Sequence, residues 1–146
     1  MGDQQLESKI LFDLVEIGPE QSIIKLSGSD KTVEVPGSVL EAQLELKNGW
    51  ALILTTENAP YDEALHVTLL DKNLEVLDQV ELSEDMTPGI VTDIRIIDGE
   101  CVQFMFNRAN PYVLGVDKSG FLLPKGSDYS KRDFARRFGK KYLYIN

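Results

Sequence analysis

The chain is poor in the side chains that most often carry chemistry, with one cysteine, one histidine and one tryptophan among 146 residues. The single cysteine, Cys101, excludes an internal disulfide framework and a zinc site built from several cysteines. It also fits a reducing compartment. No apolar run approaches the roughly 20 residues that cross a bilayer, and residues 1–7 are too polar for a signal peptide. We therefore expect a cytoplasmic protein with no membrane span.

Sequence signatures of common enzymes and cofactor sites are also missing. The chain has no glycine-rich phosphate loop, no H-E-x-x-H, no G-x-S-x-G and no C-x-x-C. We accordingly assign no catalytic residue, no metal ligand and no cofactor, and the sequence favours a protein that is not an enzyme.

Charge is divided unevenly along the chain. The net charge is −9, but residues 1–124 carry 22 acidic and 8 basic side chains, whereas residues 125–146 carry 2 acidic and 7 basic ones. We interpret residues 1–146 as a single domain, with an acidic body at 1–124 and a basic tail at 125–146. An acidic body repels nucleic-acid phosphates and attracts a basic protein surface, so we expect a protein partner and no nucleic acid.

The clearest structural pattern lies in residues 40–82. Leu40, Ala42, Leu44 and Leu46 alternate with polar residues, which predicts a half-buried antiparallel strand with these four side chains on one face. Similar short runs and turn signals recur from residue 10 to residue 123. They predict an all-β fold, an antiparallel meander of about nine to eleven strands arranged as a sandwich, an open barrel or a propeller-like stack. Asp-Lys pairs at 30–31, 71–72 and 117–118 suggest a repeat, but we favour ordinary turn chemistry as their explanation.

Two registers compete at the turn that contains Asn48 and Gly49. A two-residue turn would place Trp50 opposite Lys47. A three-residue turn with a left-handed Gly49 would instead place Trp50 opposite Leu46, with Leu52 opposite Leu44. We favour the second register because a slip of one residue would move a whole apolar set to the solvent face. A further hairpin is expected at Lys118-Ser119-Gly120, between Tyr112–Val116 and Phe121–Leu123.

The basic tail begins with a helix signal. Ser130 and Asp133 form a capping-box pattern, Phe134 and Phe138 lie four residues apart, and Gly139 fits the end of a helix. The pattern predicts one short C-terminal helix, and the alternating run at 142–145 predicts a terminal strand. We favour docking of this tail on the acidic body over binding to nucleic acid, to an anionic membrane or to a partner.

An acidic loop provides the leading functional hypothesis. Glu57, Asp62 and Glu63 surround Tyr61, and an aromatic residue among carboxylates suits an interface with a basic protein. The loop lacks the D-x-D-x-D-G spacing of a calcium-binding EF-hand. We therefore predict a non-catalytic interaction protein, of which an immunity protein that neutralises a toxin would be one version.

Two other functions stay open. A small-ligand-binding or hydrolytic domain would place its site near Tyr61, His66 and Arg108, with Tyr112 at its edge. A propeller-like structural module would associate with further copies into a homo-oligomer. A catalytic pair of Cys101 and His66 is disfavoured because both lie inside strand-like runs, where a packed thiol and a surface histidine are the ordinary interpretation.

Overall fold

The computed structural model describes residues 4–5, 12–17, 21–57, 64–83, 91–97, 101–106, 111–123, 132 and 139–145. Its regular elements are strands: β1 (Gln4–Gln5), β2 (Phe12–Ile17), β3 (Gln21–Leu26), β4 (Thr32–Pro36), β5 (Val39–Glu45), β6 (Ala51–Thr56), β7 (Ala64–Leu70), β8 (Val76–Ser83), β9 (Thr92–Ile97), β10 (Cys101–Met105), β11 (Tyr112–Phe121) and β12 (Lys141–Ile145). No helix occurs in these residues. The short C-terminal helix expected after Ser130 lies outside them, apart from Arg132, which is not helical.

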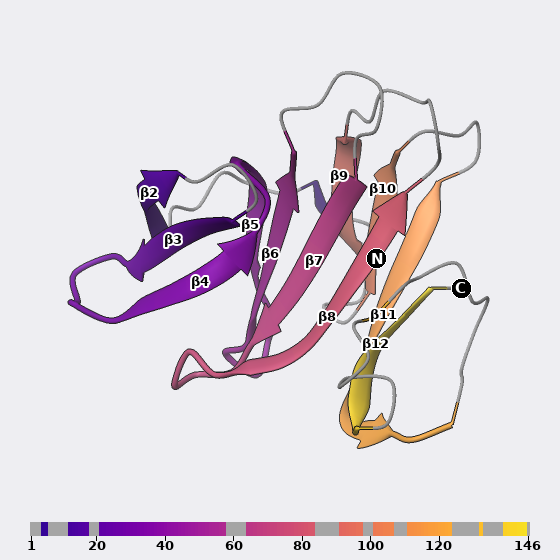
Figure 1. Cartoon of the computed structure of the whole chain (residues 1–146). Coiled ribbons are helices and arrows are strands. Elements are labelled where there is room, and N and C mark those ends of the chain that lie inside the picture. The colour runs from indigo at the N-terminus through magenta and orange to yellow at the C-terminus, as the bar shows by residue number, and fades with distance from the viewer. Residues whose placement is uncertain are drawn as a thin grey trace.

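The strands form three antiparallel sheets, which confirms the prediction of an all-β antiparallel fold. The N-terminal sheet has the order β2-β3-β4, the central sheet β5-β6-β7-β8 and the C-terminal sheet β1-β9-β10-β11-β12. Apart from β1, each sheet is a meander of strands that are consecutive in the sequence. Figure 1 shows the N-terminal sheet on one side of the central sheet and β9–β12 on the other.

The central sheet is apolar on both faces, because each face packs against another sheet. Leu52 and Leu54 of β6 join a core shared with the C-terminal sheet, whereas Ala51 and Ile53 join a second core shared with the N-terminal sheet. All six residues of β6 and all seven of β7 are consequently buried. The sequence of a strand that is covered on both faces is a continuous apolar run and does not alternate. The residues A-L-I-L at the start of β6 are such a run.

The register favoured at Asn48-Gly49 is confirmed. Leu44 pairs with Leu52 and Ala42 with Leu54. The Leu46 amide donates to the carbonyl oxygen of Trp50 at 2.8 Å, and Gly49 has a φ of 88°. Glycine takes this left-handed conformation without the steric cost that a Cβ would add.

The alternation predicted for β5 is wrong at Leu40. A β-bulge between Leu40 and Ala42 inserts one residue, so Leu40 pairs with Thr55 and packs against the core on the opposite side of the sheet from Ala42. Such a bulge reverses the side-chain direction of the residues that precede it in the same strand.

The last predicted hairpin also differs from the structure. The segment from Tyr112 to Phe121 is one irregular strand, β11, whose partner on its far side is the terminal strand β12. Leu114 pairs with Ile145 and Val116 with Leu143. The terminal strand predicted at 142–145 is therefore confirmed, and it forms one edge of the C-terminal sheet.

A buried carboxylate fastens β12 to the central sheet. Asp78 is 1% exposed and accepts hydrogen bonds from the Arg132 guanidinium at both oxygens, each at 2.9 Å. Its Oδ2 also accepts the backbone amides of Tyr142 and Leu143, each at 2.9 Å. The docking favoured for the tail is thus confirmed for Arg132 and β12, while Phe134 and Phe138 lie outside the described residues.

Candidate functional site

Three neighbouring strands of the central sheet bring one histidine and two glutamates together. His66 lies in β7, directly opposite Thr55 of β6 and Glu81 of β8. Glu57 follows the end of β6 two residues after Thr55, so it continues along the same face. The three side chains come from different strands, and their proximity is fixed by the pairing of the sheet.

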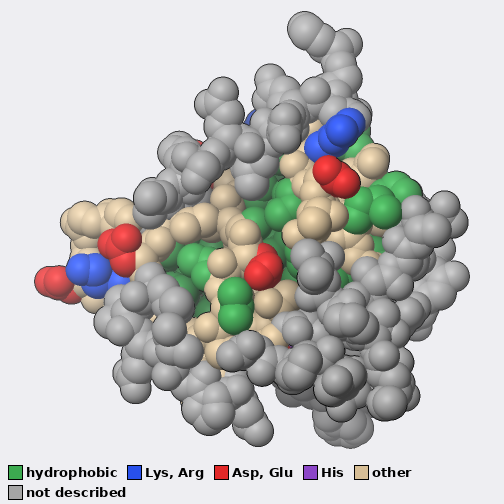
Figure 2. Space-filling view, turned by 90° about the horizontal axis from the view of Figure 1, so that it is seen from above, with side chains coloured by type: hydrophobic (Ala, Val, Ile, Leu, Met, Phe, Trp, Pro, Cys, Tyr) green, Lys and Arg blue, Asp and Glu red, His purple; other side chains and the backbone are tan. Residues whose placement is uncertain are grey.

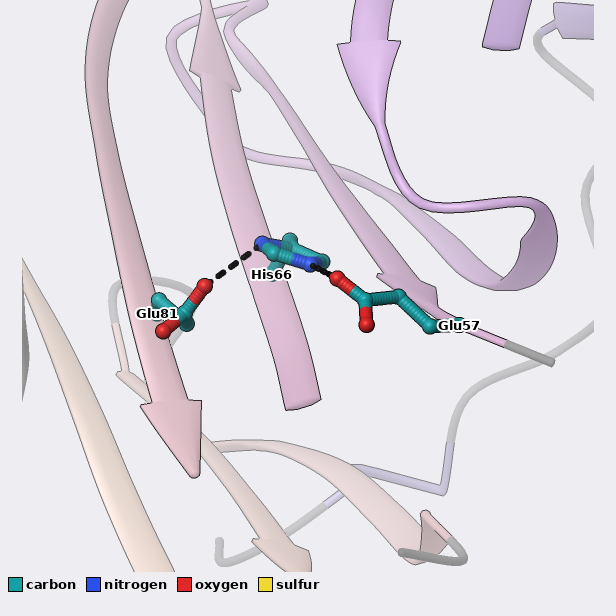
Figure 3. A group of neighbouring side chains, drawn as sticks. All are labelled: Glu57, His66 and Glu81. Carbon is teal, nitrogen blue, oxygen red and sulfur yellow. Dashed lines mark hydrogen bonds and ion pairs between the residues drawn. The ribbon is translucent and has the colours of Figure 1, made fainter. Parts of the chain in front are cut away.

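The imidazole lies between the two carboxylates (Figure 3). His66 Nε2 is 2.9 Å from Glu57 Oε1, and His66 Nδ1 is 3.7 Å from Glu81 Oε1. One donor atom from each of the three residues can be chosen so that all lie within 4.8 Å of one another. A neutral imidazole has one N–H and can donate to one of these carboxylates, leaving a lone pair towards the other.

The histidine is buried while the glutamates reach solvent. The side chain of His66 is 10% exposed, whereas those of Glu57 and Glu81 are 35% and 38% exposed. In the described part of the chain, neither glutamate has an ion pair with a lysine or an arginine. Two negative charges therefore flank a fixed imidazole without a described cation to balance them, and such an arrangement attracts a cation.

A polar row continues from this cluster along the same face. The Gln79 side chain donates to Thr68 Oγ1 at 3.2 Å, and Thr55 Oγ1 donates to the Pro36 carbonyl at 2.6 Å. The second bond ties the end of β4 to the strand beside His66. The face that holds the cluster is thus covered farther along by the N-terminal sheet.

Neither of the two predicted sites is described in full. Glu57, assigned to the partner-binding loop, and His66, assigned to the alternative ligand site, are in contact. Tyr61, Asp62, Glu63 and Arg108 lie outside the described residues. His66 was expected to face outwards as a surface residue; it is on the face opposite Leu65 and Val67, as expected, but it is buried. The error arose because a strand pattern identifies a face without revealing whether that face is buried.

Tyr112, proposed as the edge of a ligand site, belongs to the core. It is 5% exposed, its ring stacks on Phe104 with centroids 5.7 Å apart, and it packs on the face of the central sheet that Leu65 and Val67 line. His66 lies on the other face. The structure therefore does not bring Tyr112 and His66 together, while Tyr61 and Arg108, the other residues of the alternative site, lie outside the described residues.

Cys101 is likewise separated from His66. It precedes Val102, which points into the core shared with the central sheet, so Cys101 lies on the outer face of the C-terminal sheet. A Cys–His nucleophile pair is not formed. Glu81, in contrast, was missed by sequence reasoning, because its place opposite His66 depends on the β7–β8 register, which a bulge between Leu69 and Leu70 modifies.

On the face seen from above, the described acidic side chains do not merge into one patch. The view from above in Figure 2 shows Asp and Glu side chains at separate places, with hydrophobic side chains between them and basic ones beside some of them. No helix of the described residues is long and apolar enough to span a membrane. Comparison of the chain with protein-family models, with curated proteins and with solved structures finds no match in any of the three.

Proposed function

We propose that the chain is a non-catalytic interaction protein whose acidic body binds a basic protein partner, with an immunity protein as one version. The observation that carries this proposal is the pair of glutamates at one end of the central sheet, neither balanced by a described lysine or arginine. Glu57 directly follows β6, and the residues after it in the sequence include Tyr61, Asp62 and Glu63. A concentration of carboxylates with an aromatic residue would attract a basic surface and give it an anchor.

Salt dependence and charge removal test the proposal together. The purified chain, immobilised, would be exposed to lysate from its own source at about 50 mM and at about 300 mM salt, because screening weakens contacts between exposed charges. We expect a basic protein that is retained at low salt and released at high salt. The variant Asp62→Asn/Glu63→Gln should retain at least tenfold less of it, and Tyr61→Ala should weaken binding at both salt concentrations.

The control removes the same charge elsewhere. Glu41 and Glu45 are exposed on β5. Glu41→Gln/Glu45→Gln therefore removes two negative charges, as the test variant does, and should leave retention unchanged. The captured protein must then bind the purified chain directly, as measured by calorimetry. Equal loss in both double variants would indicate a nonspecific charge effect and contradict the proposal, as would recovery of no basic protein at low salt.

A second candidate is self-association of a propeller-like module. It is favoured by the three sheets, which stack in chain order and are each an antiparallel meander apart from β1. Closed propellers typically hold at least four such units, so a stack of three would gain from copies of itself. Sedimentation at micromolar concentration should then show an oligomer, and a monomer alone would dismiss this candidate.

A further inference from the structure

We propose that Glu57, His66 and Glu81 form a binding site for one divalent transition-metal ion of the zinc class. This goes beyond the proposed partner, although both proposals start from the same two glutamates. The three residues combine one imidazole nitrogen with two carboxylates, which are donor types that Zn²⁺ accepts. None of them is required by the hydrophobic cores described above. The sheet places them together although they are far apart in sequence.

The separations between donor atoms are close to those of a metal site. Metal–ligand bonds of about 2.1 Å place two ligands of a tetrahedral ion about 3.4 Å apart. His66 Nε2 and Glu57 Oε1 are 2.9 Å apart, and His66 Nδ1 and Glu81 Oε1 are 3.7 Å apart. These two distances involve different ring nitrogens, and one ion takes only one of them. For one choice of donor atom from each residue, all three atoms lie within 4.8 Å of one another, so no pair must approach by more than about 1.4 Å.

The mobility of each residue suits its part in the site. His66 is held within a paired strand and is nine-tenths buried, so the imidazole is fixed before an ion arrives. The glutamate side chains are each more than a third exposed and can change rotamer without disturbing the core. An ion can therefore enter from solvent, and three protein ligands leave a coordination position for water.

Charge favours a cation at the same place. Two carboxylates directed at one imidazole repel each other, and in the described residues no lysine or arginine pairs with either. A divalent ion would neutralise both at once. The nitrogen ligand also separates this site from a calcium site, because calcium takes oxygen ligands only.

Calorimetry and NMR on the chain stripped of metal test the proposal directly. Titration with Zn²⁺, and separately with Co²⁺, should show one ion bound per chain with a dissociation constant in the micromolar range, whereas Ca²⁺ should bind at least tenfold more weakly. His66 is the only histidine, so its imidazole resonances identify the ligand without assignment. Diamagnetic Zn²⁺ should shift them at one equivalent.

Substitutions distinguish this site from other donors on the chain. Glu57→Gln and Glu81→Gln should each weaken Zn²⁺ binding at least tenfold, and His66→Gln should abolish it. Cys101→Ser controls for binding at the thiol, and Glu45→Gln controls for loss of one exposed acidic charge; both should bind as the wild type does. The two glutamate variants keep the test valid if His66→Gln does not fold, because both lie at partly exposed positions.

Three results would overturn the proposal. The first is no Zn²⁺ binding at millimolar concentration in the folded wild-type chain. The second is binding that survives in Glu57→Gln and Glu81→Gln. The third is binding of Ca²⁺ as tight as that of Zn²⁺ without a shift of the His66 resonances. The cluster would then be a histidine hydrogen-bonded to a carboxylate and no more. Failure of this test leaves the partner proposal standing, because the latter is measured on Asp62 and Glu63.

Discussion

At the scale of single residues, Gly115 shows how closely the C-terminal sheet is packed. It pairs with Tyr144 across β11 and β12, and a Cβ built at Gly115 would lie 2.2 Å from Tyr144 Cζ. The tyrosine ring thus covers the glycine backbone and makes an edge-to-face contact with Phe121, with centroids 6.2 Å apart. This contact exists only because position 115 has no side chain.

Gly115→Ala should therefore destabilise the protein by about 1–3 kcal/mol, because the Tyr144 ring must leave its place over the strand. Urea unfolding followed by the fluorescence of Trp50 measures the loss. The double variant Gly115→Ala/Tyr144→Ala should lose less than the sum of the two single variants, since the methyl group no longer meets a ring. Strict additivity of the two losses would contradict this explanation.

At the scale of elements, β12 is attached through one residue of another sheet. Asp78 lies in β8, and the next side chain on the same face of that strand is apolar. Its carboxylate accepts hydrogen bonds from two backbone amides of β12 and from the Arg132 guanidinium. The side chains of Asp78 and Arg132 are 2% and 10% exposed. Arg132 also donates to the Leu143 carbonyl oxygen. The pair thus satisfies polar groups along the edge of β12 that would otherwise be buried without partners.

Breaking this buried ion pair should be costly. Arg132→Met leaves the Asp78 carboxylate buried without its counter-charge and should lower the free energy of unfolding by about 3–5 kcal/mol, and Asp78→Asn should have an effect of similar size. The double variant should lose clearly less than the sum, with a coupling of about 1–3 kcal/mol. Lys47→Met, at an exposed position between β5 and β6, is the control and should change the free energy by less than about 1 kcal/mol. Additive losses, or a control as damaging as Arg132→Met, would argue against the attachment.

The sequence predicts those elements whose physics is local. The turn at Gly49 and its register followed from the need to keep Leu44 and Leu52 on one face, and the structure agrees. The bulge at Leu40 was not predictable, because an extra residue leaves no mark in an alternating pattern. The pairing of β11 with β12 was not predictable either, since it joins segments separated by about 20 residues and depends on Asp78, which in the sequence only interrupts an apolar run.

The candidate site was likewise predictable only in part. The face of His66 was predicted correctly, because alternation around Leu65 and Val67 determines it. Its burial and its contact with Glu81 were not, because they depend on tertiary packing and on the register of β7 with β8. A pattern along one strand carries no information about either.

At the scale of the whole molecule, the central sheet supports two cores of unequal size. Among the described residues, eighteen buried side chains form the core with the C-terminal sheet and six form the core with the N-terminal sheet. The smaller core includes Ile24 of β3, which is fully buried, and Ile53 of β6. Since hydrophobic stabilisation scales with the apolar area buried, the N-terminal sheet should be the less stable part and should open while the other two sheets remain folded.

Native-state hydrogen exchange tests this order of stability. Amides of β3 should exchange faster than those of β7 and β10 in the wild type. Ile24→Ala removes a buried side chain, a change that costs about 2–5 kcal/mol, and should reduce protection in β2–β4 while leaving β10 and β11 nearly unchanged. Leu114→Ala, the matched change in the larger core, should lower protection in all three sheets, because the central sheet depends on that core. If Ile24→Ala reduces protection in β10 as much as in β3, the three sheets unfold as one unit, and the unequal cores do not create separate levels of stability.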